Sequence, residues 1–179
     1  MRKIVLTFGL ISGAIMSGLM FLGVLFHDQI GFDRGLIVGY TSMVIAFLMV
    51  YFGVRSYRDN VAGGTVTFGR AFLVGLLISL VSIACYVAMW QVTYRTVASD
   101  YDEKYTAYAL DQAKKAGATE AELAQQAKEM QEFWESYQNP LVNIAFTIIE
   151  PLPVGLVFTL VTAGVLSRKR RAPAQVAAG

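Results

Sequence analysis

Apolar residues in this chain are gathered into four long blocks that polar segments separate. The blocks hold few or no charged residues and cover 4–26, 35–54, 71–94 and 141–167. Each is about as long as the roughly 20 residues with which a helix crosses ~30 Å of hydrocarbon. Only a helix pairs all backbone groups within one isolated segment in lipid. The pattern therefore predicts transmembrane helices at about 4–26, 35–54, 68–95 and 141–166.

The polar segment 96–139 lies between the third and fourth blocks and has helical signals of its own. Thr119 and Glu122 form a capping-box pattern at a helix start, and Gly117 is a suitable stop for a preceding helix. The segment is therefore predicted to be a helical hairpin, with arms at about 100–116 and 120–138.

Basic residues set the expected orientation. The side of the membrane that holds the N-terminus, the 55–70 loop and the tail has nine Lys and Arg residues against one acid, whereas the other side has six against eleven. The positive-inside rule then places both termini in the cytoplasm and the hairpin in the periplasm. The first block continues to Phe26 without a small-residue cleavage site, so we expect an uncleaved anchor rather than a signal peptide.

Composition agrees with this fold class. Of the 179 residues 55% are hydrophobic and 16% are charged, while about 25% are charged in ordinary soluble domains. The expected fold is all-α: a polytopic membrane protein with four transmembrane helices and a periplasmic helical hairpin between helices three and four. It forms a single membrane domain over 1–171, and 172–179 is expected to be a disordered cytoplasmic tail because it has too little apolar variety to pack.

Small residues at four-residue spacing predict close helix contacts in two of the helices. In lipid, small side chains let helix backbones approach each other. Such contacts form either within one chain or along the seam of a homodimer. The predicted helix-packing residues are Gly9, Gly13, Gly35 and Gly39.

The last block contains an acid followed by two prolines. Glu150 lies nine residues inside the outer end of its predicted helix, roughly 13 Å deep, where a carboxylate is costly and usually faces the bundle interior or a water-filled cavity. Pro151 and Pro153 lack backbone N–H groups, so the helix should kink or break there and present a helix N-terminus to the carboxylate.

Polar residues at the same depth in the other helices complete a candidate intramembrane site. They are Ser17, Thr41, Ser42, Ser82, Cys85 and Tyr86. Two interpretations are open: a buried acid that hydroxyl groups satisfy, which locks the bundle, or a proton or cation site at a broken helix.

The second hairpin arm carries an apolar stripe, which is a candidate partner face. Its residues are Leu123, Ala127, Met130, Trp134 and Tyr137. The stripe either packs against Tyr101, Tyr105 and Tyr108 of the first arm and the membrane surface, or docks a periplasmic or membrane partner.

Several short motifs together resemble a known family. They are Tyr57-Arg58-Asp59, the run from Gly63 to Gly75, Glu150-Pro151-Leu152-Pro153-Val154-Gly155 and Ser167-Arg168-Lys169. The chain resembles the bacterial integral membrane family catalogued as domain of unknown function 4199. The resemblance implies a four-helix bacterial inner-membrane protein and transfers no catalytic residue.

The first hypothesis of function is a structural or accessory subunit of a membrane assembly, because the chain shows no catalytic constellation and has a periplasmic hairpin. The alternative is an oligomeric small-solute or proton transporter that uses Glu150.

Enzymatic activity is not expected, because Ser82 and Cys85 lack a histidine that could act as base. One cysteine and one histidine make a metal site unexpected, and we expect no cofactor and no nucleic acid. The expected partners are the lipid bilayer and either a second copy or another membrane protein.

Overall fold

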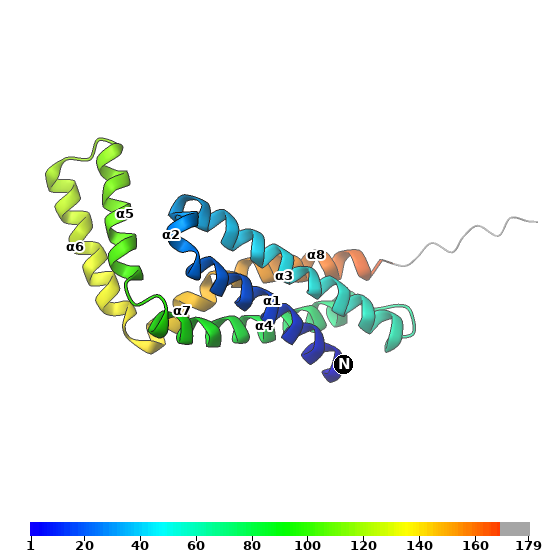
Figure 1. Ribbon diagram of the computed structural model, residues 1–179. Helices are drawn as coiled ribbons and strands as arrows, with labels where there is room; N and C mark the ends of the chain where they lie inside the picture. Colours follow the sequence, from blue (N-terminus) through cyan, green and yellow to red (C-terminus); the bar gives the residue numbers. More distant parts are fainter. Residues whose placement is uncertain (169–179) are drawn as a thin grey trace, which may run out of the picture.

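A computed structural model describes residues 1–168, and within this range the chain is all-helical and without strands (Figure 1). The predicted tail at 172–179 lies outside the described residues. The helices are α1 (Arg2–Leu25), α2 (His27–Ile30), α3 (Phe32–Asn60), α4 (Phe68–Thr96), α5 (Tyr101–Lys115), α6 (Glu120–Tyr137), α7 (Pro140–Ile149) and α8 (Pro151–Leu166).

Within residues 1–168, four helical stretches are long and apolar enough to cross a membrane. They are α1, α3, α4 and the pair α7–α8, which runs over Pro140–Leu166. This confirms the predicted all-α class with four candidate spans and indicates a multi-pass membrane protein. Helix α3 continues to Asn60, beyond the predicted 35–54, because charged residues end a membrane span but not a helix, and Arg55 pairs with Asp59 at 3.6 Å one turn later.

Helix α4 lies at the centre of the bundle and packs against α1, α3, α7 and α8. The N-terminus, the α3–α4 connection and the end of α8 all lie at the end of the bundle opposite the hairpin (Figure 1). Side chains with less than 2% exposure fill the core, among them Phe47, Met16, Met43, Ile78, Val50 and Val74.

Two of the four predicted packing glycines lie at a close helix contact. A Cβ atom on Gly9 would lie 2.7 Å from the Cβ of Val81, and one on Gly13 would lie 2.6 Å from the Cβ of Cys85. Both distances are too short for real atoms, so any larger residue at either position would push α1 away from α4. These glycines therefore set the α1–α4 separation.

The prediction of close contacts at Gly35 and Gly39 was wrong for contacts within the chain. A Cβ atom on either glycine would meet no atom within 4 Å. The outer half of α3 leaves the bundle there, and Leu36 and Ile37 are 68% and 69% exposed. Three glycines that the spacing pattern missed are close-packed instead: Gly53, Gly75 and Gly155.

Helices α5 and α6 form the predicted hairpin, which projects from one end of the bundle (Figure 1). Thr119 and Glu122 make the complete capping box at the start of α6. Gly117 adopts a φ of 93°, which a residue with a side chain rarely adopts, and it lies in the turn between the two arms. The periplasmic location of the hairpin stays a prediction.

Candidate functional site

The prolines interrupt the last span at Glu150. Helix α7 ends at Ile149 and α8 begins at Pro151, while the N–H of Glu150 reaches the carbonyl of Phe146 at a long 3.4 Å. Glu150 itself keeps helical angles (φ −63°, ψ −57°), and its side chain makes no capping bond to α8. The break is therefore where the sequence predicts it, but the expected contact of the carboxylate with the N-terminus of α8 is not made.

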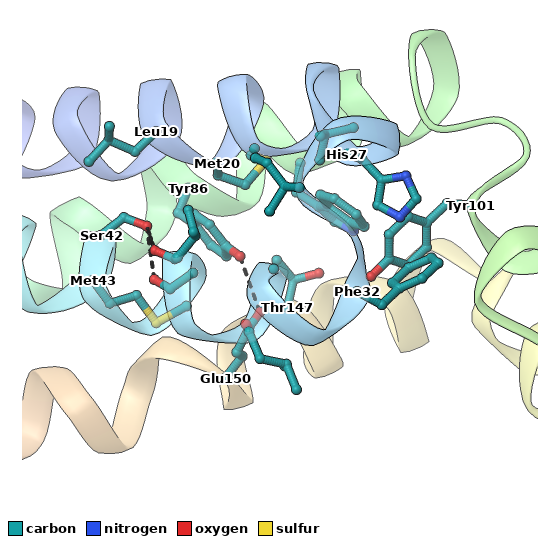
Figure 2. A pocket seen from close by; sticks show the side chains of 18 of the residues that line it. Leu19, Met20, His27, Phe32, Ser42, Met43, Tyr86, Tyr101, Thr147 and Glu150 are labelled. Carbon is teal, nitrogen blue, oxygen red and sulfur yellow. Dashed lines mark hydrogen bonds between the residues drawn. The ribbon is translucent and has the colours of Figure 1, made fainter. Parts of the chain in front are cut away.

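The Glu150 carboxylate has a hydrogen-bond donor on another helix. The hydroxyl of Tyr86, a buried residue of α4, donates to Oε2 of Glu150 at 3.1 Å (Figure 2). Glu150 is exposed on the chain taken alone. A buried acid that hydroxyl groups satisfy was one of the two interpretations from the sequence. Among the described residues the structure gives Glu150 one hydroxyl partner and leaves it accessible.

Glu150 and Tyr86 line a cavity of about 360 Å³. Its wall comes from every helix except α8. Helix α3 packs mainly against α1, α4 and α8, whereas α7 packs against α4, α6 and α8, so the outer half of α3 and α7 leave a space between them. The lining includes Met16, Leu19, Met20, Gly23, His27, Phe32, Gly35, Gly39, Ser42, Met43, Trp90, Tyr101, Tyr105, Tyr137, Phe146 and Thr147.

The cavity contains an acid without a basic partner. Among the described residues that line it, Glu150 is the only Asp, Glu, Lys or Arg, and His27 is the other titratable group apart from the tyrosines. His27 lies 3.3 Å from Asp28 through Nδ1, and its buried Nε2 has no hydrogen-bond partner in the described part of the chain. A carboxylate in an apolar space without a counter-charge favours the arrival of a positive group.

An aromatic cluster closes the hairpin end of the cavity. We use this name for Phe32, Trp90, Tyr101, Tyr105 and Tyr137. Phe32 lies 5.7 Å from Tyr101 and 5.3 Å from Tyr105 between ring centroids, and Trp90 Nε1 donates to the Tyr137 hydroxyl at 3.0 Å. Burial raises the pKa of Tyr101 to about 12, so this ring carries no charge near neutral pH. Figure 2 shows Phe32 and Tyr101 at the opposite end from Ser42 and Met43.

The other residues of the predicted polar site do not meet at Glu150. Ser42 lines the same cavity, but its hydroxyl lies 2.6 Å from the carbonyl of Val38 and 2.9 Å from that of Gly39. Ser82 bonds to carbonyl groups of Gly9 and Ile78. Thr41 is exposed and is not part of the cavity lining, so it does not belong to the site.

Ser17 and Cys85 also lie away from the carboxylate. Ser17 Oγ is buried without a hydrogen-bond partner among residues 1–168, and Cys85 packs at Gly13. The polar site was predicted from the depth of each residue along its helix, which does not determine the direction in which a side chain points around the helix axis. Of the predicted residues, only Tyr86 points toward Glu150 and bonds to it.

Sequence reasoning missed a polar pair next to the site. Gln91 Nε2 donates to Oδ1 of Asn143 at 2.6 Å between α4 and α7, and the Thr147 hydroxyl donates to the Asn143 carbonyl at 2.7 Å. Both amides lie in or at the edge of apolar blocks. Because polar groups in lipid form hydrogen bonds with neighbouring helices, their positions in the sequence could have predicted a contact between these helices.

Two polar contacts join α5 to the bundle beside the cavity. The Lys104 ammonium lies 3.0 Å from the Asp28 carboxylate, and the Tyr108 hydroxyl donates to the Asp33 carboxylate. Lys104 holds the pKa of Asp28 below its usual value, mainly through the hydrogen bond. We call these contacts the hairpin tethers.

The apolar stripe of α6 faces the chain itself over its C-terminal part. Trp134 lies 6.3 and 6.1 Å from Tyr101 and Tyr105 between ring centroids, and its Nε1 donates to Thr106 at 3.0 Å. Tyr137 is buried. Tyr108, which was expected in this packing, lies against Phe32 of α3 instead. Leu123, Ala127 and Met130 are half-buried, so a partner face at their end of α6 stays a prediction.

Comparison with curated proteins and with solved structures found no match. A family model described as "protein of unknown function (DUF4199)" matches residues 7–168, which is most of the chain and includes every element of the cavity. The chain therefore belongs to this family.

Proposed function

We propose that this protein is a multi-pass protein of the bacterial inner membrane, with both termini in the cytoplasm, that binds a small and mostly apolar solute in the cavity at Glu150. The observation that carries the proposal is an acid on the wall of a 360 Å³ cavity that has a single hydrogen-bond donor among residues 1–168. Ligand sites are typically cavities of about 300 to 1,000 Å³ with apolar walls and a few polar groups.

The position of the acid supports a role in transport, the second of the hypotheses from the sequence. Transporters place substrate sites near the middle of the bilayer at interrupted helices, and Glu150 lies between α7 and α8 in the last candidate span. Four spans are few for a transport path, so transport requires self-association. The face of α3 that carries Ile37 and Val44, which are 69% and 43% exposed and lie outside the cavity lining, is available for a second copy.

The accessory-subunit hypothesis has one observation in its favour. The α5–α6 hairpin projects beyond the bundle (Figure 1). The Phe133 side chain on α6 is 38% exposed. If the protein is a subunit, crosslinking and purification in several mild detergents recovers the same second membrane protein each time. Recovery of this chain alone would contradict this second candidate function. Neither candidate function includes a catalytic reaction.

Binding in the cavity can be tested with a neutral dye that fluoresces in apolar surroundings, N-phenyl-1-naphthylamine, and the purified protein in lipid nanodiscs. The test variant is Gly39→Leu, because Gly39 lines the cavity and has space for a larger side chain. The matched control is Gly164→Leu on α8, where an added Cβ also meets no atom within 4 Å but which is not part of the lining.

We expect saturable dye binding to the wild type and to Gly164→Leu, and at least about tenfold weaker binding to Gly39→Leu because the new side chain occupies the cavity. Absence of saturable binding to the wild type, or equal binding to both variants, would overturn the proposal.

A further inference from the structure

The charge of the lining restricts what the cavity can hold. Glu150 is the only Asp, Glu, Lys or Arg among the described lining residues, and its one hydrogen bond comes from the neutral Tyr86. An anionic solute would place two negative charges in an apolar space. A cationic solute would supply the counter-charge that the lining lacks, and a charge pair gains most where water is excluded.

The aromatic content of the wall favours the same sign of charge. Eight of the lining side chains are Phe, Tyr or Trp. The faces of aromatic rings carry partial negative charge and attract ammonium groups, and cages of such rings are the usual recognition site for quaternary ammonium ions. In Figure 2, Tyr101 and Phe32 lie at one end of the cavity and Ser42 and Met43 at the other. Tyr86 lies between these ends and donates its hydrogen bond to the Glu150 carboxylate.

The remaining wall determines the body of the solute. Met16, Met20 and Met43 line the side formed by α1 and α3. Thioether side chains are flexible and polarizable and adapt to apolar groups of differing shape. The Ser42 hydroxyl already has carbonyl partners of its own helix, so it offers little to a polar solute.

We propose that the solute of this cavity is an amphipathic organic cation, with an ammonium group between Glu150 and the aromatic cluster and an apolar body against the methionines. This inference rests on the proposed function, that the cavity binds a solute, and adds its chemical class.

The charge can be tested with two compounds of nearly equal shape, benzyltrimethylammonium and its neutral carbon analogue 2,2-dimethylpropylbenzene. Each compound competes with N-phenyl-1-naphthylamine for the purified protein in nanodiscs of neutral lipid. Neutral lipid is required because an anionic membrane surface would concentrate the cation by itself. Because the neutral analogue enters lipid more readily, the partition of each compound into protein-free nanodiscs is measured first. We expect the cation to compete at a concentration in the membrane at least about tenfold lower than that of the neutral analogue.

Glu150→Gln tests the source of that preference, and Glu132→Gln is the control, because Glu132 is an acid on α6 outside the cavity lining. We expect Glu150→Gln to lower the preference for the cation at least about fivefold, because only the aromatic rings still attract it, and Glu132→Gln to keep the full preference. If Glu150→Gln does not fold, Tyr101→Leu answers the same question: it reduces binding of the cation by at least about fivefold and leaves the neutral analogue nearly unchanged.

The outcomes separate the two proposals. Equal competition by both compounds with the wild-type protein, or a preference for the neutral one, overturns the cation inference and leaves the proposed function intact. A preference for the cation that is undiminished in both Glu150→Gln and Tyr101→Leu also overturns it. Failure of the dye itself to bind overturns the proposed function.

Discussion

At the scale of single residues, the structure depends on a few side chains that cannot be replaced even by residues of similar size or polarity. Tyr86 and Glu150 show this for polarity, because the hydroxyl of one is the described donor to the carboxylate of the other. Gly13 shows it for volume, because the Cβ of Cys85 occupies the space that a side chain would need. Both cases give a test with a matched control.

Tyr86→Phe is expected to lower the free energy of unfolding by about 1–3 kcal/mol, because it keeps the ring and removes the donor to a carboxylate. Reversible unfolding in mixed micelles, followed by circular dichroism, measures this value. The control is Tyr40→Phe, which removes a hydroxyl from a side chain that is 49% exposed. An equal loss in both variants would show that the Tyr86–Glu150 bond does not stabilise the fold.

Gly13→Ala is expected to cost about 1–3 kcal/mol, since overpacking forces helices apart, and the new Cβ would lie 2.6 Å from the Cβ of Cys85. The same unfolding assay applies. Gly18→Ala is the control on the same helix, where an added Cβ meets no atom within 4 Å. Unchanged stability of Gly13→Ala would contradict the close α1–α4 approach.

At the scale of elements, the hairpin is joined to the bundle by two kinds of contact. The aromatic cluster contributes apolar packing. The hairpin tethers contribute exposed polar contacts from α5 to α2 and to the first turn of α3. Exposed ion pairs are individually weak. The tethers therefore fix the position of α5 more than they stabilise the fold, and their removal should loosen the docking of the hairpin without unfolding it.

Acid is expected to loosen the hairpin. The pKa of Asp28 is lower in the folded protein than its ordinary value, so its contact with Lys104 stabilises docking above the ordinary value and is lost as pH falls through the lowered one. Spin labels on Ile37→Cys and Lys114→Cys, in a Cys85→Ala background, measure the distance between α3 and α5. The distance distribution should broaden at low pH, and Asp28→Asn should broaden it at neutral pH. Identical distributions in all three cases would contradict the tether.

The ends and types of the elements were mostly predictable, whereas the contents of the site were not. Thr119 and Glu122 marked the start of α6 because a capping box is a local interaction. The interruption at Glu150 followed from the missing N–H groups of two prolines. The misplaced members of the site, Thr41 and Ser82, depend on the rotation of each helix about its axis, which packing against other helices determines.

At the scale of the whole molecule, the bundle is tight at one end and open at the other. Close glycine contacts join α1 to α4 and α8 to its neighbours, while the outer half of α3 stands away from α7 and the hairpin covers the space between them. The N-terminus and the end of α8 lie at the tight end (Figure 1). The charge distribution predicts that this end faces the cytoplasm.

Labelling of single cysteines tests that orientation. In a Cys85→Ala background, Lys114→Cys on the hairpin is expected to react with a membrane-impermeant maleimide in spheroplasts that have intact inner membranes. Val61→Cys in the α3–α4 connection, where the native side chain is 52% exposed, should react only after the membrane is permeabilised. The reverse pattern would invert the orientation and place the hairpin in the cytoplasm.

For the proposed binding function, the accessibility of Glu150 determines the route that a solute would take to the cavity. The residue lies inside a candidate membrane span, lines the cavity and is exposed on the chain taken alone. If this span crosses the bilayer as proposed, the exposed side of Glu150 lies at the depth of the acyl chains. A molecule that enters on this side comes sideways out of the lipid and not from water. Its concentration at the site is then set by how strongly it partitions into the bilayer. In a series of homologous amines at one aqueous concentration, the occupancy of the cavity should therefore increase with chain length. The increase follows from the partition coefficient alone, even if the longer amines make no additional contact with the protein.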